Sequence, residues 1–280
     1  MSVPETTLPG AQAHPVTSRW SRWRQWAIRI WYGLLSVWVL LMAHGVMDVA
    51  TGRVASGEQF LSATVTAWKL LAAGAVIVIC WTAGRSVVAF QALVVGMVAW
   101  SVAEWLWATP EADATPALSA ISSIVLWFVP LVALRPQRRE LLNVHPTWYL
   151  PLLALAASAA VPLLVYALHQ AALVTDPTGS EAAREATSMG VVLAAQICFA
   201  ALRPGGTRWV PRLVVAAAGC VALAAIAWPD DIASPGRAWG AALAAWSVAF
   251  AVTVETAGSR RGRKGAGVRP GARRSHAAPW

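Results

Sequence analysis

VVAFQALVVGMVAWSVAEWLW, residues 87–107, decides the class of this protein, because it is an apolar run whose one charged residue is Glu104. About 20 apolar residues in helical conformation cross the hydrocarbon core of a bilayer. The rest of the chain has the same character, since 58% of its 280 residues are hydrophobic and only 12% are charged. A water-soluble domain of this size carries more charge. The composition therefore predicts a membrane protein with several spans.

Seven further apolar stretches of comparable length flank this one. We expect helices, because a chain in hydrocarbon must satisfy its backbone hydrogen bonds within each segment, and barrel strands are shorter and alternate in polarity. The second and sixth stretches are short, so they either extend into flanking sequence or do not cross fully. The eight predicted spans are Ile28–Met47, Thr66–Trp81, Val87–Trp107, Ala117–Leu134, Trp148–His169, Ser188–Leu202, Val210–Trp228 and Ala238–Glu255.

Basic residues alternate between the gaps that separate these spans. The tails and every second gap are rich in arginine, as at Arg138 and Arg139, whereas the other gaps collect acidic residues such as Glu111 and Asp113. Arginine-rich loops stay in the cytoplasm. We therefore predict a multi-pass protein of the cell membrane with both termini cytoplasmic. The net charge of +9 belongs to loops and tails that face lipid headgroups, so the lipid bilayer, and no nucleic acid, is the expected partner.

Both tails have the composition of surface segments. Trp20, Trp23, Ala27 and Ile30 recur at helical spacing with arginines between them, as in a helix that lies in the membrane interface. The C-terminal tail is rich in Gly, Pro and Arg, which is typical of disorder. The predicted segments are a cytoplasmic basic tail with an interfacial helix at 1–26, a four-helix repeat at 27–134, a cytoplasmic loop at 135–148, a second four-helix repeat at 149–257 and a disordered basic cytoplasmic tail at 258–280.

An internal duplication is the basis for those two repeats. ALVVGMVAWSVAEWLWATPEADATP, residues 92–116, aligns with RLVVAAAGCVALAAIAWPDDIASP, residues 212–235, at an offset near 120 residues. Four spans restore the starting orientation of the chain, so the halves would be parallel repeats about an axis along the membrane normal. The predicted fold is an all-α bundle of about eight transmembrane helices, built as two parallel four-helix repeats.

Three charged residues of the first half have no charged counterpart in the second. Asp48, Lys69 and Glu104 align with Leu173, with apolar residues near Val192, and with Ala224. Ionisable groups near hydrocarbon are costly unless they face a bundle interior, a partner or water. They point to a polar pocket at the external end of the first half. The alternative is structural: Asp48 lies among headgroups, Lys69 extends its amine outward, and Glu104 hydrogen-bonds to a neighbouring helix.

These residues suggest two classes of function. The first is binding or transport of a small or lipid-soluble molecule through the outer-leaflet pocket. The second is an intramembrane enzyme acting on an isoprenoid or quinone-like substrate, such as a proton-initiated terpene cyclase, in which tryptophans shield a cation. Glu104 and Asp48 are the candidate catalytic proton donors. The candidate ligand-binding residues are His44, Lys69, Trp105, Trp107 and His169.

The two histidines allow a further alternative. His44 and His169 occupy related positions in the two halves and could be the two axial ligands of a haem in a structural or haem-binding subunit. A histidine at a helix end is otherwise an ordinary interfacial side chain. No other cofactor and no metal is predicted, because the three cysteines lie within apolar stretches without CxxC spacing.

AWKLLAAGAVIV, residues 67–78, resembles the DoxX-type membrane family, in which a lysine and a leucine open the second span of a four-helix unit. The resemblance covers the first half of the chain. Some members are associated with quinone-linked redox systems, so it implies a four-helix membrane unit and a link to quinones. The tandem arrangement, and the lack of the lysine in the second half, depart from that family. The whole chain is also similar to uncharacterised eight-span bacterial membrane proteins, which implies no activity.

Overall fold

The computed structural model describes residues 19–42, 48, 51–52, 57–82, 86–107, 125, 148–173, 180–202 and 209–266. Within these ranges the regular structure is helical, and no strand occurs. The helices are α1 (Arg19–Met42), α3 (Gln59–Trp81), α4 (Val87–Trp107), α7 (Leu150–Leu173), α8 (Ser180–Leu202), α9 (Trp209–Ala227) and α10 (Arg237–Ala266). The predicted all-α class is confirmed for this part of the chain.

Six of the described helices, α3, α4, α7, α8, α9 and α10, are long and apolar enough to cross a membrane. The two spans that look short in the sequence both begin earlier than predicted, at Gln59 and Ser180, and each helix has 23 residues. At a rise of 1.5 Å per residue this is roughly 34 Å, which exceeds the hydrocarbon thickness. Both helices are therefore long enough to cross, and the protein is a multi-pass helical membrane protein.

The first described helix contains the segment that the sequence predicted to lie in the membrane interface. Helix α1 runs without a break from Arg19 to Met42, so its arginine-rich start and its apolar part form one element. Tyr32 and Val39 are buried in one cluster with residues of α3 and α4, whereas Trp23 is 62% exposed. The tryptophan-rich turns thus extend from the bundle on the same helix that packs into it. Residues 43–47 of the first predicted span lie outside the described residues.

Two other predictions fall at the limits of the described chain. Helix α10 continues to Ala266, beyond the expected end of the last span at Glu255. The predicted disordered tail is therefore helical over residues 258–266, while residues 267–280 lie outside the described ranges. The fourth predicted span, Ala117–Leu134, also lies outside them except for Val125, whose backbone is helical.

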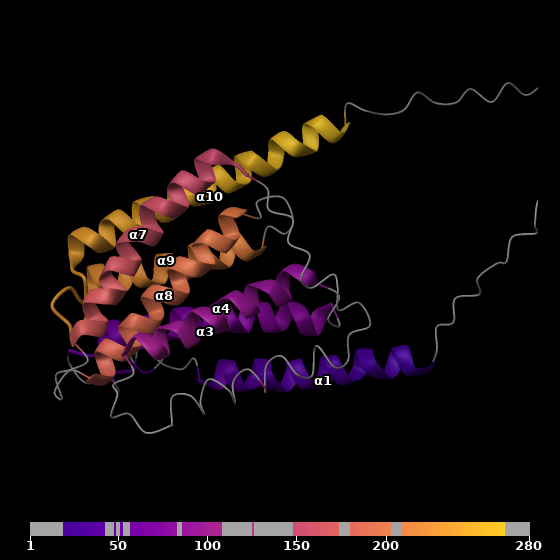
Figure 1. Cartoon of the computed structure of the whole chain (residues 1–280), viewed down its shortest axis with the longest axis horizontal. Helices are drawn as coiled ribbons and strands as arrows, with labels where there is room; N and C mark the ends of the chain where they lie inside the picture. Colours follow the sequence, from indigo (N-terminus) through magenta and orange to yellow (C-terminus); the bar gives the residue numbers. More distant parts are fainter. Residues whose placement is uncertain are drawn as a thin grey trace, which may run out of the picture.

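The helices run side by side, with α1 along one edge of the bundle, α7 and α10 along the opposite edge, and α3, α4, α8 and α9 between them (Figure 1). Helices α3, α8 and α10 begin at one end, where α4, α7 and α9 finish. Hydrogen bonds join the starts and finishes: Phe60 donates to Asp231, Tyr166 to the carbonyl of Ala233, and Thr187 to the carbonyl of Ala167. We call this end the acidic end, because it carries Glu58, Glu104, Glu185, Asp230 and Asp231.

Helix packing has a regular pattern between the two halves of the chain. Helix α1 packs on α3 as α7 packs on α8, and α3 packs on α9 as α8 packs on α4. Helix α8 also begins and ends 121 residues after α3. The main buried cluster lies where α3, α7, α8, α9 and α10 meet, and it is built mostly of alanine and branched aliphatic side chains. Small side chains allow such helices to approach closely.

Candidate functional site

Glu104 lies near the end of α4 with its side chain inside the bundle, where only 8% of the residue is exposed. Two charged residues from the start of α8, Arg184 and Glu185, interact with it electrostatically. The sequence suggested Lys69 and Asp48 as its neighbours, and the structure adds these two charges from the second half of the chain. An acidic side chain is thus held between α4 and α8 at the acidic end.

The position of Glu104 follows from helical spacing. Leu93, Met97, Trp100 and Glu104 recur at intervals of four, three and four residues, so they lie on one face of α4. Leu93 and Met97 line the space between α4, α3 and α8. Glu104 therefore continues, toward the acidic end, the same face that packs into the three-helix interface.

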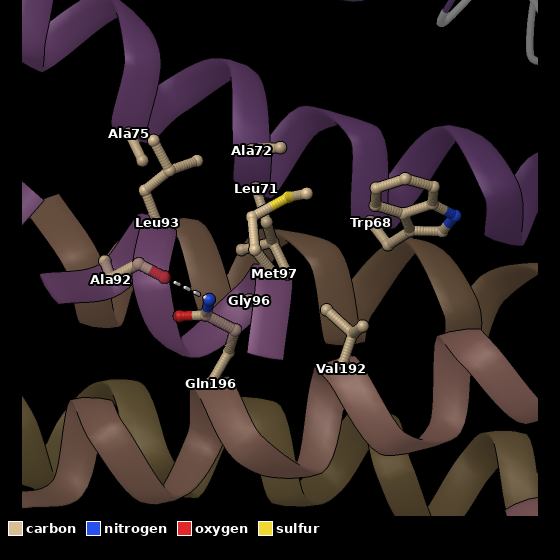
Figure 2. Close-up of a pocket in the computed structure, with 10 residues that line it drawn as sticks. All are labelled: Trp68, Leu71, Ala72, Ala75, Ala92, Leu93, Gly96, Met97, Val192 and Gln196. Carbon is tan, nitrogen blue, oxygen red and sulfur yellow. Dashed lines mark hydrogen bonds between the residues drawn. The ribbon is translucent and has the colours of Figure 1, made fainter. Parts of the chain in front are cut away.

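This interface contains a small cavity lined by residues of α3, α4 and α8 (Figure 2). Its volume is about 20 Å³, which is enough for one water molecule. Beside it, Nε2 of Gln196 donates a hydrogen bond to the carbonyl oxygen of Ala92 at 2.8 Å, joining α8 to α4. A Cβ atom added to Gly96 would lie 2.8 Å from that nitrogen, so a glycine here allows Gln196 to reach α4.

Two tryptophans lie between the cavity and Glu104. The rings of Trp68 on α3 and Trp100 on α4 have centroids 4.3 Å apart. The indole nitrogen of Trp68 is buried and has no acceptor among the described residues. In Figure 2 it lies on the side of the ring turned away from Ala72 and Ala75, which is the side of the acidic end. A buried donor without an acceptor is unfavourable, so this nitrogen is suited to bind a polar group of a ligand.

Polar groups therefore follow one another along the contact of three helices toward the acidic end. We call this line the α3–α4–α8 seam, formed by Gln196, Trp68, Trp100, Glu104 and Glu185. Sequence reasoning found Glu104 but missed the others. Gln196 was detectable as a polar residue within a predicted span. Glu185 was assigned to an external gap, because the sixth span was predicted to start only at Ser188.

The other predicted site residues are distributed over several surfaces. Lys69 is half-buried on α3, ten residues after the helix start, which is about 15 Å along the axis and deeper than predicted. Asp48 is half-buried, and its carbonyl oxygen accepts a hydrogen bond from Thr51. Trp105 is 74% exposed, and His169 is exposed on α7. His44 and the side chain of Trp107 lie outside the described residues.

Metal-binding geometry does not occur in the described ranges, which contain no cluster of three or more His, Cys, Asp or Glu side chains that could hold an ion. No family model matches the chain, and no curated protein or solved structure is significantly similar to it. Fold and site together define a multi-pass helical membrane protein with an acidic side chain buried between its helices.

Proposed function

We propose that the protein binds or transports a small or lipid-soluble molecule at the acidic end of the bundle, with Glu104 of the α3–α4–α8 seam as the central polar group. The observation that carries this proposal is the burial of Glu104 within a membrane-spanning helix. An ionisable side chain in this setting is costly, and in membrane proteins such residues mark substrate, ion or proton sites. The neighbouring indole nitrogen of Trp68 adds a hydrogen-bond donor.

An internal duplication supports this assignment. We infer two parallel four-helix repeats, because the packing pattern of α1, α3 and α4 matches that of α7, α8 and α9. The positions of α9 that align with Glu104 are Ala224 and Ala225, which are both buried. The repeat scaffold therefore forms without a carboxyl group at this place, and Glu104 is available for function.

Two four-helix repeats imply eight membrane spans, and the arginine pattern implies their orientation. Helices α4 and α7 both finish at the acidic end, which supports a fourth span at Ala117–Leu134 between them. Together with the first span this makes eight. From the arginine pattern we propose that the acidic end is external, that both termini are cytoplasmic and that the protein lies in the cell membrane.

An intramembrane enzyme is the second candidate. The paired rings of Trp68 and Trp100 beside Glu104 favour it, because aromatic faces stabilise a cationic intermediate while a carboxylic acid donates the initiating proton. The substrate would be isoprenoid or quinone-like, which agrees with the resemblance of residues 67–78 to the DoxX-type family. The haem alternative needs His44, outside the described residues, and His169, which is exposed on α7.

Replacement of Glu104 tests the proposal. Glu104→Gln keeps the size of the side chain and its hydrogen bonding but removes the titrating proton. We expect this variant to reach normal abundance in the membrane and to fail to restore the lipid-soluble metabolite profile of a deletion strain, measured by lipidomics. Glu255→Gln makes the same chemical change at an exposed site on α10 and is the control.

Two outcomes separate function from scaffold. Normal abundance of Glu104→Gln together with a fully restored profile would reject the proposal. Glu104→Leu adds a folding control, since an apolar side chain there tests whether the bundle itself requires a polar group. Loss of abundance with Leu, but not with Gln, would mean that Glu104 also contributes to assembly.

A further inference from the structure

A second hollow lies on the outside of the bundle, where α4, α7 and α8 meet. It is a groove of about 410 Å³, and every side chain that lines it is apolar or a cysteine. Its rim includes Val98 on α4, Leu164 on α7 and Cys198 on α8, all of which are exposed. Because these helices are long and apolar enough to cross a membrane, apolar walls of this kind suit a hydrocarbon chain.

The groove has a polar boundary toward the acidic end. Residues seven and eleven apart lie on the same face of a helix. Trp105 therefore continues the groove face of α4 beyond Val94 and Val98, and Arg184 precedes Val191 and Ala195 on the groove face of α8. Trp105 is 74% exposed, and Arg184 is also exposed. The charged group of Arg184 and the indole ring of Trp105 thus lie where the apolar walls of the groove end.

We propose that this groove binds one hydrocarbon chain of an anionic lipid, whose phosphate is bound by the guanidinium group of Arg184. Arginine presents planar, paired N–H donors that match a phosphate group. Arg184 lies seven residues before Val191, about 10 Å along the helix. Its charge therefore lies beyond the apolar walls of the groove, at the depth expected of a lipid headgroup. Trp105 is suited to that depth, because indole rings favour the membrane interface.

The internal repeat indicates that the helical scaffold does not require an arginine at the position of Arg184. The position of α3 that aligns with Arg184 is Ala63, which is buried. The lipid site does not depend on the function proposed for the α3–α4–α8 seam, although Arg184 interacts electrostatically with Glu104.

Lipid binding to the purified, delipidated full chain tests the proposal. The probes are phosphatidylglycerol and phosphatidylcholine, and bound lipid is counted by native mass spectrometry. We expect the wild type to prefer phosphatidylglycerol, and Arg184→Gln to bind it about tenfold more weakly, as expected when a charged hydrogen bond is lost. Arg184→Lys keeps the charge but loses the paired donors, so its affinity should lie between those of the wild type and Arg184→Gln. Arg237→Gln removes an exposed arginine at the same end of the bundle and should have no effect.

The native cysteines give a second measurement that needs no variant. Cys198 lines the groove, whereas Cys220 is exposed on α9 and is not among the groove residues. We expect phosphatidylglycerol to slow the reaction of Cys198 with a membrane-permeant maleimide and to leave the reaction of Cys220 unchanged. Cys198→Trp should block lipid binding by filling the groove, and Cys220→Trp is its control.

Several results would overturn the proposal. Equal binding of the two lipids, or equal effects of Arg184→Gln and Arg237→Gln, would reject a headgroup site at Arg184. A reaction rate of Cys198 that is insensitive to phosphatidylglycerol would reject occupation of the groove. A Cys198 that is unreactive even without lipid would mean that part of the chain itself, such as Ala117–Leu134, fills it.

Discussion

The backbone N–H of Phe60 donates a hydrogen bond to Oδ2 of Asp231 at 3.0 Å, and so joins residues 171 positions apart in the chain. One residue further, the N–H of Ile232 donates to the carbonyl oxygen of Gly57 at 3.0 Å. Asp231 thus satisfies a donor in the first turn of α3, where Glu58 makes no side-chain capping bond. The loop between α9 and α10 thereby fastens the start of α3 at the acidic end.

Removal of this cap should destabilise the bundle. Loss of a capping side chain costs about 0.5–2 kcal/mol, so we expect Asp231→Ala to lower the thermal unfolding midpoint in detergent. Asp230→Ala is the matched control, because Asp230 is the exposed neighbour in the same loop. Equal midpoints for the two variants would show that the bond to Phe60 contributes nothing to stability.

Close helix packing predicts a contrast between two glycines. A Cβ atom on Gly240 of α10 would lie 2.8 Å from the carbonyl oxygen of Ala222 and 3.0 Å from Cβ of Ala225. Gly240→Ala should therefore separate α10 from α9 and lower the unfolding midpoint. Gly219→Ala meets no atom within 4 Å and should be neutral or stabilising by up to about 1 kcal/mol, since alanine favours helix. The same midpoint shift in both variants would contradict this account of the packing.

The hydrogen bond between Gln196 and Ala92 predicts non-additive effects. Gln196→Leu removes the donor, and Gly96→Ala places a Cβ atom 2.8 Å from it, so either change disrupts the same bond. Bonds between membrane helices contribute about 0.6 kcal/mol on average and up to about 1.7. We expect the double variant to lose less stability than the two single losses together, as a double-mutant cycle measures. Strict additivity would mean that Gly96→Ala acts elsewhere.

Helix bounds were easy to predict where polar residues border an apolar run, and hard where polar side chains find partners within the helix. The bounds of α4 were predicted correctly, because its apolar run is bordered by polar residues. The sequence left open whether the second and sixth spans extend into flanking sequence, and α3 and α8 do extend, to Gln59 and Ser180. Polar and charged residues lower the hydropathy of both added stretches. Threonine hydroxyl groups near these ends bond within the helix, as Thr66 does to the carbonyl of Ser62 and Thr187 to that of Ala183. Such residues are compatible with a helix in the membrane.

The composition of the seam could not be predicted in the same way. Helical spacing places Glu104 and Trp100 on one face of α4, but which helices meet that face depends on the tertiary packing. The late start assigned to α8 also left Arg184 and Glu185 in a loop. As a result the sequence predicted Lys69 or Asp48 of its own half within reach of Glu104 and missed the charges that α8 of the other half supplies.

The orientation of the bundle is tested by labelling single cysteines in a chain whose three native cysteines are replaced by alanine. The arginine pattern predicts that Glu111→Cys is external and Arg138→Cys is cytoplasmic. We expect an impermeant maleimide to modify the first in intact cells and the second only after permeabilisation. The reverse pattern would invert the topology, and with it the assignment of the acidic end to the outside.

Helix α1 has a mechanical consequence. Its 24 residues form a rod of about 36 Å, with Arg22 and Trp23 exposed near one end and Tyr32 and Val39 packed against the bundle farther along. Trp and Arg side chains anchor a helix in the lipid interface, and helices tilt when bilayer thickness changes. Because the rod has no break, a force on its anchored end turns the packed end with it. A change in the tilt of α1 would therefore also move the side chains that pack on α3.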